Sequence, residues 1–129
     1  MPKKILVVED NDDIRIALCD RLLSMGFEVV TENNGHSALS HISRETSRSP
    51  IQGVLLDLAV PEFGGIAFLR ELRDRHPEIQ VIVMSSASDT AALFEARKLG
   101  ARSSLRKPFD RQRDRQRDWE RIYWMFHNE

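Results

Sequence analysis

A small set of charged and polar residues stands at the ends of short apolar segments in this chain, where packing alone gives no reason for them. Four of them follow runs of aliphatic residues that are typical of buried strands, and Lys107 follows a shorter apolar segment around Leu105. The set contains three carboxylates, one hydroxyl and one ammonium, and in chain order it consists of Glu9, Asp10, Asp57, Ser85 and Lys107. If these side chains meet in space, they can bind a divalent cation and a phosphoryl group.

The three carboxylates predict a cation site. Like charges held close together repel and raise at least one pKa unless a cation neutralises them. A hard ion such as Mg²⁺ prefers oxygen ligands and keeps several waters. Lys107 adds a compact positive charge and Ser85 a hydroxyl, both suited to phosphoryl oxygens. Asp57 stands alone at the end of a central apolar segment, so we expect it to be the nucleophile that forms an acyl phosphate.

The elements that must position these residues alternate between strand and helix patterns. A helix carrying Ile66, Leu69 and Leu72 follows the chain break at Pro61 and Gly64-Gly65. The other expected helices cover about 13–25, 37–44 and 90–99, and the expected strands cover about 4–8, 27–31, 52–56, 80–84 and 103–106. Short strands separated by helices predict βαβ units and a parallel sheet.

The topology of such a sheet brings the polar residues together. Right-handed crossovers place helices on both faces, and ligands bind at the carboxyl ends of the strands. All five candidate residues lie at that edge. Each alone has a purely structural explanation, since an acidic pair after a strand often caps a helix and a lone aspartate often forms a turn. Their coincidence at four strand ends favours a site.

The bulk composition excludes several classes of protein. A net charge of −1 over 129 residues gives no global reason to bind nucleic acid. The single cysteine, Cys19, excludes an internal disulfide and fits a reducing cytoplasm, and its place in an amphipathic pattern favours a packed thiol. No apolar stretch approaches the length of a membrane span. We therefore expect a soluble cytoplasmic protein of one domain.

The chain resembles a two-component response-regulator receiver domain of the CheY-like superfamily. The resemblance covers about Lys3–Phe109. It rests on four features, which are the segment 5–11, the segment Leu56–Pro61 with Gly65, the serine that closes the fourth strand, and Lys107-Pro108-Phe109. It implies a flavodoxin-like, doubly wound α/β fold with five parallel strands in the order 2-1-3-4-5 and helices on both faces.

The resemblance also implies a role for each site residue. Asp57 would accept a phosphoryl group from phosphohistidine on a sensor histidine kinase or a histidine phosphotransfer protein. Mg²⁺ would be held by Asp10, Asp57 and the backbone carbonyl of Ala59, with Glu9 acting mainly through a bound water. Lys107 would contact the phosphoryl group, and the hydroxyl of Ser85 would move towards it.

Ser85 competes with Ser86 for the hydroxyl role. Ser86 precedes Ala87 and could mimic the hydroxyl-alanine pair of the family. Ser85 directly follows the apolar segment and stands 22 residues before Lys107, which fits the family register better. We therefore favour Ser85.

Three positions depart from the family pattern. The residue three before the lysine, usually Phe or Tyr, is Ser104, so signalling by rotation of an aromatic ring is not expected in its usual form. Backbone shifts alone remain an alternative. The residues two beyond Asp57 and Ser85 are Ala59 and Ala87. Neither can orient a water, so we expect dephosphorylation without side-chain assistance.

The expected last helix, at about 110–129, is also atypical. Asp110–Asp118 alternates arginine, aspartate and glutamine with no apolar residue, and its interleaved aspartates argue against direct binding to nucleic acid. Apolar residues then recur at helical spacing, at Trp119, Ile122, Tyr123 and Phe126. Three interpretations stay open, which are packing on the same domain, pairing with a second copy of the chain as a homodimer, and an accidental tail.

Two functional hypotheses compete. One is a phosphoacceptor that signals to a downstream protein and is not an enzyme in the usual sense. No output domain follows, so we expect either a stand-alone relay or the receiver portion of a longer chain. The other is a phosphorylation-independent interaction module with a vestigial acidic site. A phosphatase of the same fold class is disfavoured because it would want a second acid at position 59, where Ala59 stands.

Overall fold

The structure is a computed structural model that describes residues 3–45, 49–61, 63–86, 89–107 and 112–127. Strands and helices alternate along these residues. In chain order they are β1 (Lys4–Val8), α1 (Asp12–Ser24), β2 (Glu28–Glu32), α2 (Gly35–Arg44), β3 (Ile51–Asp57), α3 (Gly65–Arg75), β4 (Gln80–Ser86), α4 (Thr90–Lys98), β5 (Ser103–Lys107) and α5 (Gln112–His127). None of the described helices is long and apolar enough to cross a membrane.

The five strands form one parallel sheet in the order β2-β1-β3-β4-β5. This confirms the expected fold class and strand order. The register places Asp57 of β3 level with Met84 of β4, and Ser86 of β4 level with Lys107 of β5. The carboxyl ends of β3, β4 and β5 therefore lie at the same edge.

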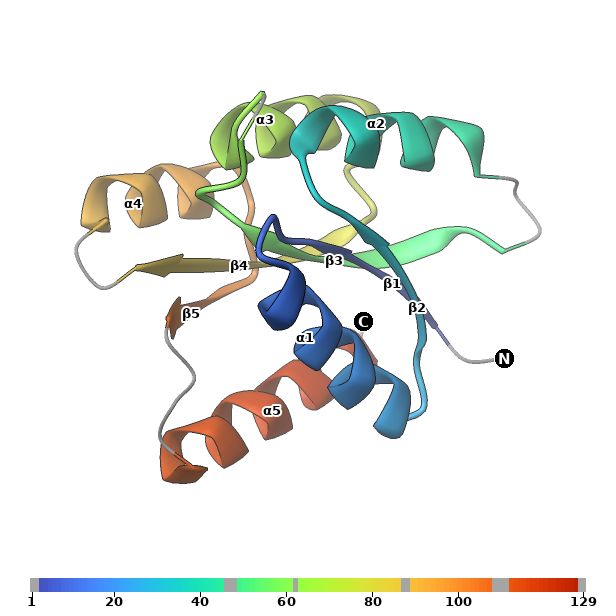
Figure 1. Ribbon diagram of the computed structural model, residues 1–129. Coiled ribbons are helices and arrows are strands. Elements are labelled where there is room, and N and C mark those ends of the chain that lie inside the picture. The colour runs from blue at the N-terminus through green and yellow to red at the C-terminus, as the bar shows by residue number, and fades with distance from the viewer. Residues whose placement is uncertain (1–2, 46–48, 62, 87–88, 108–111, 128–129) are drawn as a thin grey trace.

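The sheet lies between two layers of helices (Figure 1). α1 and α5 cover one face, and α2, α3 and α4 cover the other. Successive side chains of a strand point to opposite faces. Ile5 of β1 accordingly packs in the core under α1 and α5, whereas Leu6 packs in the core under the other three helices. The three central strands, β1, β3 and β4, are buried on both faces, which explains why their segments are mostly apolar.

Local hydrogen bonds explain where the helices next to the site begin. The Oδ1 atom of Asn11 accepts from the amide of Ile14 at 3.0 Å, which caps α1 directly after the acidic pair. Asn34 caps α2 in the same way through the amide of Ser37, at 2.8 Å. Because Asn34 is the cap, α2 begins at Gly35, two residues earlier than the apolar pattern predicts.

Several strands extend further than expected. β3 includes Asp57, β4 includes both Ser85 and Ser86, and β5 reaches Lys107. The expected ends were set where the apolar residues stop, but the backbone continues to pair in the sheet beyond that point. The candidate residues of β3, β4 and β5 are thus held by strand backbone.

The last helix packs on its own domain. Trp119, Ile122 and Phe126 are buried against residues of α1, β1 and β3, together with Met125. The guanidinium of Arg21 in α1 lies over the ring of Trp119, 5.7 Å from its centroid. The self-packed interpretation is therefore the one observed.

The four α5 residues considered for pairing with a second copy of the chain differ in their exposure. Trp119, Ile122 and Phe126 are buried in the core of their own domain, and of the four residues only Tyr123 is exposed, at 45%. The physical reason is that α1 and the sheet leave an apolar gap which the three buried side chains fill. Homodimer pairing through α5 stays a prediction. Side chains of the arginine-rich repeat before residue 116 lie outside the described residues.

Candidate functional site

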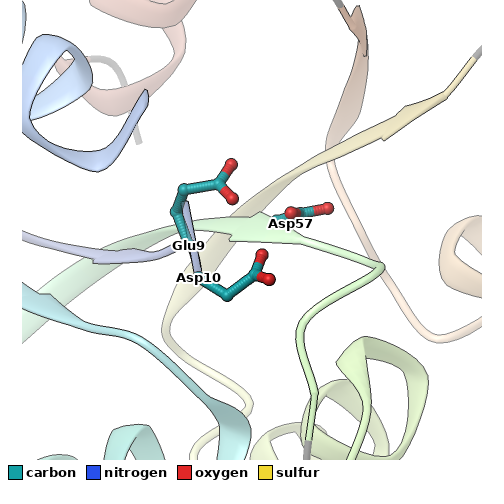
Figure 2. A group of neighbouring side chains, drawn as sticks. All are labelled: Glu9, Asp10 and Asp57. Carbon is teal, nitrogen blue, oxygen red and sulfur yellow. The ribbon is translucent and has the colours of Figure 1, made fainter. Parts of the chain in front are cut away.

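Two neighbouring strands bring the three acidic residues together. Glu9 and Asp10 directly follow β1, and Asp57 is the last residue of the adjacent β3. Each offers one oxygen, and these oxygens all lie within 4.8 Å of one another. Figure 2 shows the three side chains converging at this edge of the sheet. Glu9 and Asp57 are buried, at 1% and 2% exposure, whereas Asp10 is exposed.

Lys107 joins two of these carboxylates. Its Nζ atom donates to Oε1 of Glu9 at 2.5 Å and to Oδ2 of Asp57 at 2.9 Å. Burial alone lowers the pKa of Lys107, but the bonds to the two carboxylates outweigh this effect and raise the pKa overall. The lysine is therefore an ammonium ion that partly neutralises the acidic group.

Glu9 has the most perturbed titration in the site. Burial raises the pKa of Glu9 to about 7, the hydrogen bond from Lys107 opposes the rise, and Asp57 adds to it. The expectation that clustered carboxylates raise at least one pKa is confirmed. Its main cause, however, is loss of solvent and not repulsion.

The loop after β3 holds the other oxygen of Asp57. The amide of Ala59 donates to Oδ1 of Asp57 at 3.0 Å. The amide of Gly65 donates to the carbonyl of Leu58 at 3.3 Å, and a Cβ atom at Gly65 would lie 2.5 Å from Cα of Leu58. Only glycine permits this close approach. The role of the Ala59 carbonyl as a metal ligand stays a prediction.

The two serines of β4 differ in burial. Ser85 is 2% exposed, stands one position beyond the register partner of Asp57, and donates from Oγ to the carbonyl of Ser86 at 3.3 Å. Ser86 is exposed. The buried position of Ser85 supports its choice over Ser86, and its role stays a prediction. Ala87, Pro108 and Phe109 lie outside the described residues.

The donor set fits a hard divalent cation. Glu9, Asp10 and Asp57 offer only oxygen atoms, which is the chemistry that Mg²⁺ prefers. Asp10 faces solvent, so an ion bound there can keep waters. A cation would share the buried oxygens with Lys107, whose flexible stem permits a small displacement.

Two arginine contacts were not predicted from the sequence. Nη1 of Arg15 in α1 donates to the carbonyl of Glu9 at 3.0 Å. Nη2 of Arg121 in α5 donates to the carbonyl of Ser104 at 2.9 Å. The spacing of residues in the sequence does not predict either contact, because both depend on long side chains that reach another element.

Comparison with known families gives a clear match. Residues 5–117 match the family model described as "Response regulator receiver domain". A solved response regulator receiver domain protein from Clostridium thermocellum superposes with a TM-score of 0.82 at 26% identity, covering 98% of this chain and 92% of that one.

Two relatives differ in length. The chain is 35% identical over 107 residues to Regulatory protein AtoC of Escherichia coli, covering 83% of this chain and 22% of AtoC. It is 34% identical over 110 residues to Sporulation initiation phosphotransferase F of Bacillus subtilis, covering 85% and 86%. The chain thus spans about a fifth of the first relative and most of the second.

Proposed function

The chain belongs to the response regulator receiver domain family, and we propose that Asp57 is its phosphoacceptor, receiving a phosphoryl group from phosphohistidine. The donor would be a sensor histidine kinase or a histidine phosphotransfer protein. One observation carries the proposal. Asp57 is buried at the end of β3 with one oxygen held by the Ala59 amide at 3.0 Å and the other by Lys107 at 2.9 Å.

The residues divide the chemistry among them. A carboxylate oxygen of Asp57 attacks phosphorus, the bond from phosphorus to the histidine nitrogen breaks, and its electron pair returns to the imidazole. Lys107 offsets the charge on the phosphoryl oxygens. The Ala59 amide fixes the orientation of the nucleophile. Burial excludes bulk water from the acceptor and strengthens each of these contacts.

We propose Mg²⁺ as the cofactor of this site. Glu9, Asp10 and Asp57 would hold it, with the Ala59 carbonyl as a further ligand. Bound there, the ion would supply positive charge for the phosphoryl oxygens. The same three residues carry the negative charge that makes transfer of an anion unfavourable without a cation.

Phosphorylation would change the surface that a partner reads. The new group adds about 1.5 to 2 negative charges, which attract the Lys107 ammonium and the Ser85 hydroxyl. Ser104 lacks an aromatic ring, so we propose that the change travels through the backbone of β5. The downstream partner is an unidentified protein, and the single free cysteine, Cys19, suits a cytoplasmic location.

The competing hypothesis is an interaction module whose acidic site is vestigial. Incubation with Mg²⁺ and a small acyl-phosphate donor, followed by intact-mass measurement, separates the two. The phosphoacceptor proposal expects a gain of one phosphoryl group in the wild type and none in Asp57→Asn. No gain in a folded wild-type protein would reject the proposal in favour of the module.

A further inference from the structure

The carbonyl of Glu9 marks the point where β1 leaves the sheet and turns towards α1. The amide of Glu9 still pairs with the sheet, since it donates to the carbonyl of Glu32 at 3.1 Å. The carbonyl of Glu9 instead accepts from Nη1 of Arg15 at 3.0 Å. Nη2 of the same guanidinium donates to Oδ1 of Asp12 at 2.6 Å. One side chain of α1 therefore ties the end of β1 to the first residue of the helix.

Asp10 is the site residue whose position depends most on this turn. Lys107 holds the carboxylates of Glu9 and Asp57. The carboxylate of Asp10 is exposed and has no hydrogen bond or ion pair with any described residue. It nevertheless offers an oxygen within 4.8 Å of the other two. The backbone on either side of Asp10 must therefore set its place.

The guanidinium is well suited to hold that backbone. Its side chain is only 19% exposed, and a hydrogen bond from a charged donor is roughly twice as strong as a neutral one. The planar fork of arginine reaches two acceptors at once, the carbonyl of Glu9 and the carboxylate of Asp12. A lysine at this position offers a single point charge in place of the fork.

We propose that Arg15 is a positioning residue for the cation site, acting through the carbonyl of Glu9 to place the Asp10 carboxylate. This inference rests on the proposed binding of Mg²⁺ at Glu9, Asp10 and Asp57. Arg15 itself touches neither the cation nor the phosphoryl group.

The sign of one measurement separates positioning from simple electrostatics. Arg15 is a positive charge beside the cation site, so removing it reduces repulsion of Mg²⁺ and, by charge alone, tightens binding. Removing the clamp frees the turn that carries Asp10 and weakens binding. The two effects act in opposite directions on the dissociation constant.

The test measures the Mg²⁺ dissociation constant by NMR, following the backbone amides of Asp10 and Asn11 in the full chain. Arg15→Gln removes the charge and the fork, and Arg15→Lys removes only the fork. Arg70→Gln is the matched control, because Arg70 is an exposed residue of α3 paired with Glu95 at 3.2 Å. Its loss changes the net charge equally but leaves the turn untouched.

We expect Arg15→Gln to weaken Mg²⁺ binding about 10-fold, as loss of a residue that orients a metal ligand commonly does. Arg15→Lys should also bind Mg²⁺ more weakly than wild type. If Arg15→Gln does not fold, the result for Arg15→Lys tests the positioning role. Arg70→Gln should bind like wild type. Equal or tighter binding in the Arg15 variants overturns the positioning role and leaves the proposed function intact. Absence of Mg²⁺ binding in the wild type would instead overturn both the cofactor proposal and this inference.

Discussion

Glu9 and Lys107 make the stability of the metal-free chain depend on pH. Because burial raises the pKa of Glu9 from 4.5 to about 7, the folded chain holds a proton that the unfolded chain has released between these values. The stabilisation from this proton is complete below 4.5 and is lost as pH rises through about 7. The hydrogen bond from Lys107 to Glu9 lowers the pKa of Glu9 and so reduces this loss of stability, but burial has the larger effect.

We therefore expect the free energy of unfolding to fall between about pH 5 and about pH 8, by about 1–3 kcal/mol more in wild type than in Glu9→Gln. Urea unfolding of both proteins in the presence of a chelator measures the difference. Saturating Mg²⁺ should shrink it, since a cation favours the ionised carboxylate. An equal fall in the two proteins would show that Glu9 is not its source.

Ala59 supports a second expectation at the residue scale. Its side chain is an exposed methyl group, which cannot direct a water at an acyl phosphate on Asp57. Ala59→Asn supplies an amide, so we expect the lifetime of the phosphorylated form to shorten several-fold. Ala59→Leu is the apolar control. Intact-mass measurements at intervals after donor removal give the lifetimes, and an unchanged lifetime in Ala59→Asn contradicts the idea.

The proximity of Glu9, Asp10, Asp57 and Lys107 could be predicted because each stands at the end of an apolar segment. The contacts of Arg15 and Arg121 could not be predicted, since a long flexible side chain can reach many acceptors and no spacing selects one. The position of Asp57 inside β3 also escaped prediction. Backbone pairing with β4 continues where the apolar residues have already stopped.

At the scale of the elements, Gly53 of β3 explains how α5 docks. A Cβ atom at Gly53 would lie 2.6 Å from Cε1 of Phe126 and 2.9 Å from Cδ1 of Ile5. The missing side chain therefore makes the space into which Phe126 packs. The repeat that opens α5 contains no apolar residue, and so the sequence alone left this packing undecided.

We expect Gly53→Ala to destabilise the chain by about 1–3 kcal/mol, as overpacking of a core does. Phe126→Leu in the same chain should recover part of this loss, because the smaller side chain no longer occupies the position of the new methyl group. Urea unfolding of the two single variants and the double variant gives the coupling energy. Strict additivity of the two changes would contradict direct packing of Phe126 on Gly53.

The contact between Arg121 and Ser104 connects two elements of the fold, α5 and β5. It joins α5 to the backbone of β5 at 2.9 Å, three residues before Lys107. Ser104 occupies the position that usually holds Phe or Tyr in the family, and its backbone carbonyl is bonded to the last helix. If phosphorylation shifts β5 as we propose, this link would carry the shift to α5 without ring rotation.

For the whole molecule, a few general rules of protein architecture were enough to predict the topology of the sheet. Alternating strand and helix patterns, right-handed crossovers and apolar strands buried on both faces leave a doubly wound sheet as the consistent solution. That topology brings the ends of β1, β3 and β5 to one edge, and it makes residues 9, 57 and 107 neighbours despite their separation in the chain.

Asp57, and not another carboxylate of the cluster, is the residue that we propose to carry the phosphoryl group. The most direct measurement treats the chain with Mg²⁺ and an acyl-phosphate donor, reduces the product with borohydride, and sequences the peptides by mass spectrometry. Reduction converts a phosphorylated aspartate to homoserine. We predict homoserine at position 57 only when both donor and Mg²⁺ are present. Homoserine at position 10, a reduced residue at position 9, or no reduced residue at all would contradict the assignment of Asp57 as phosphoacceptor.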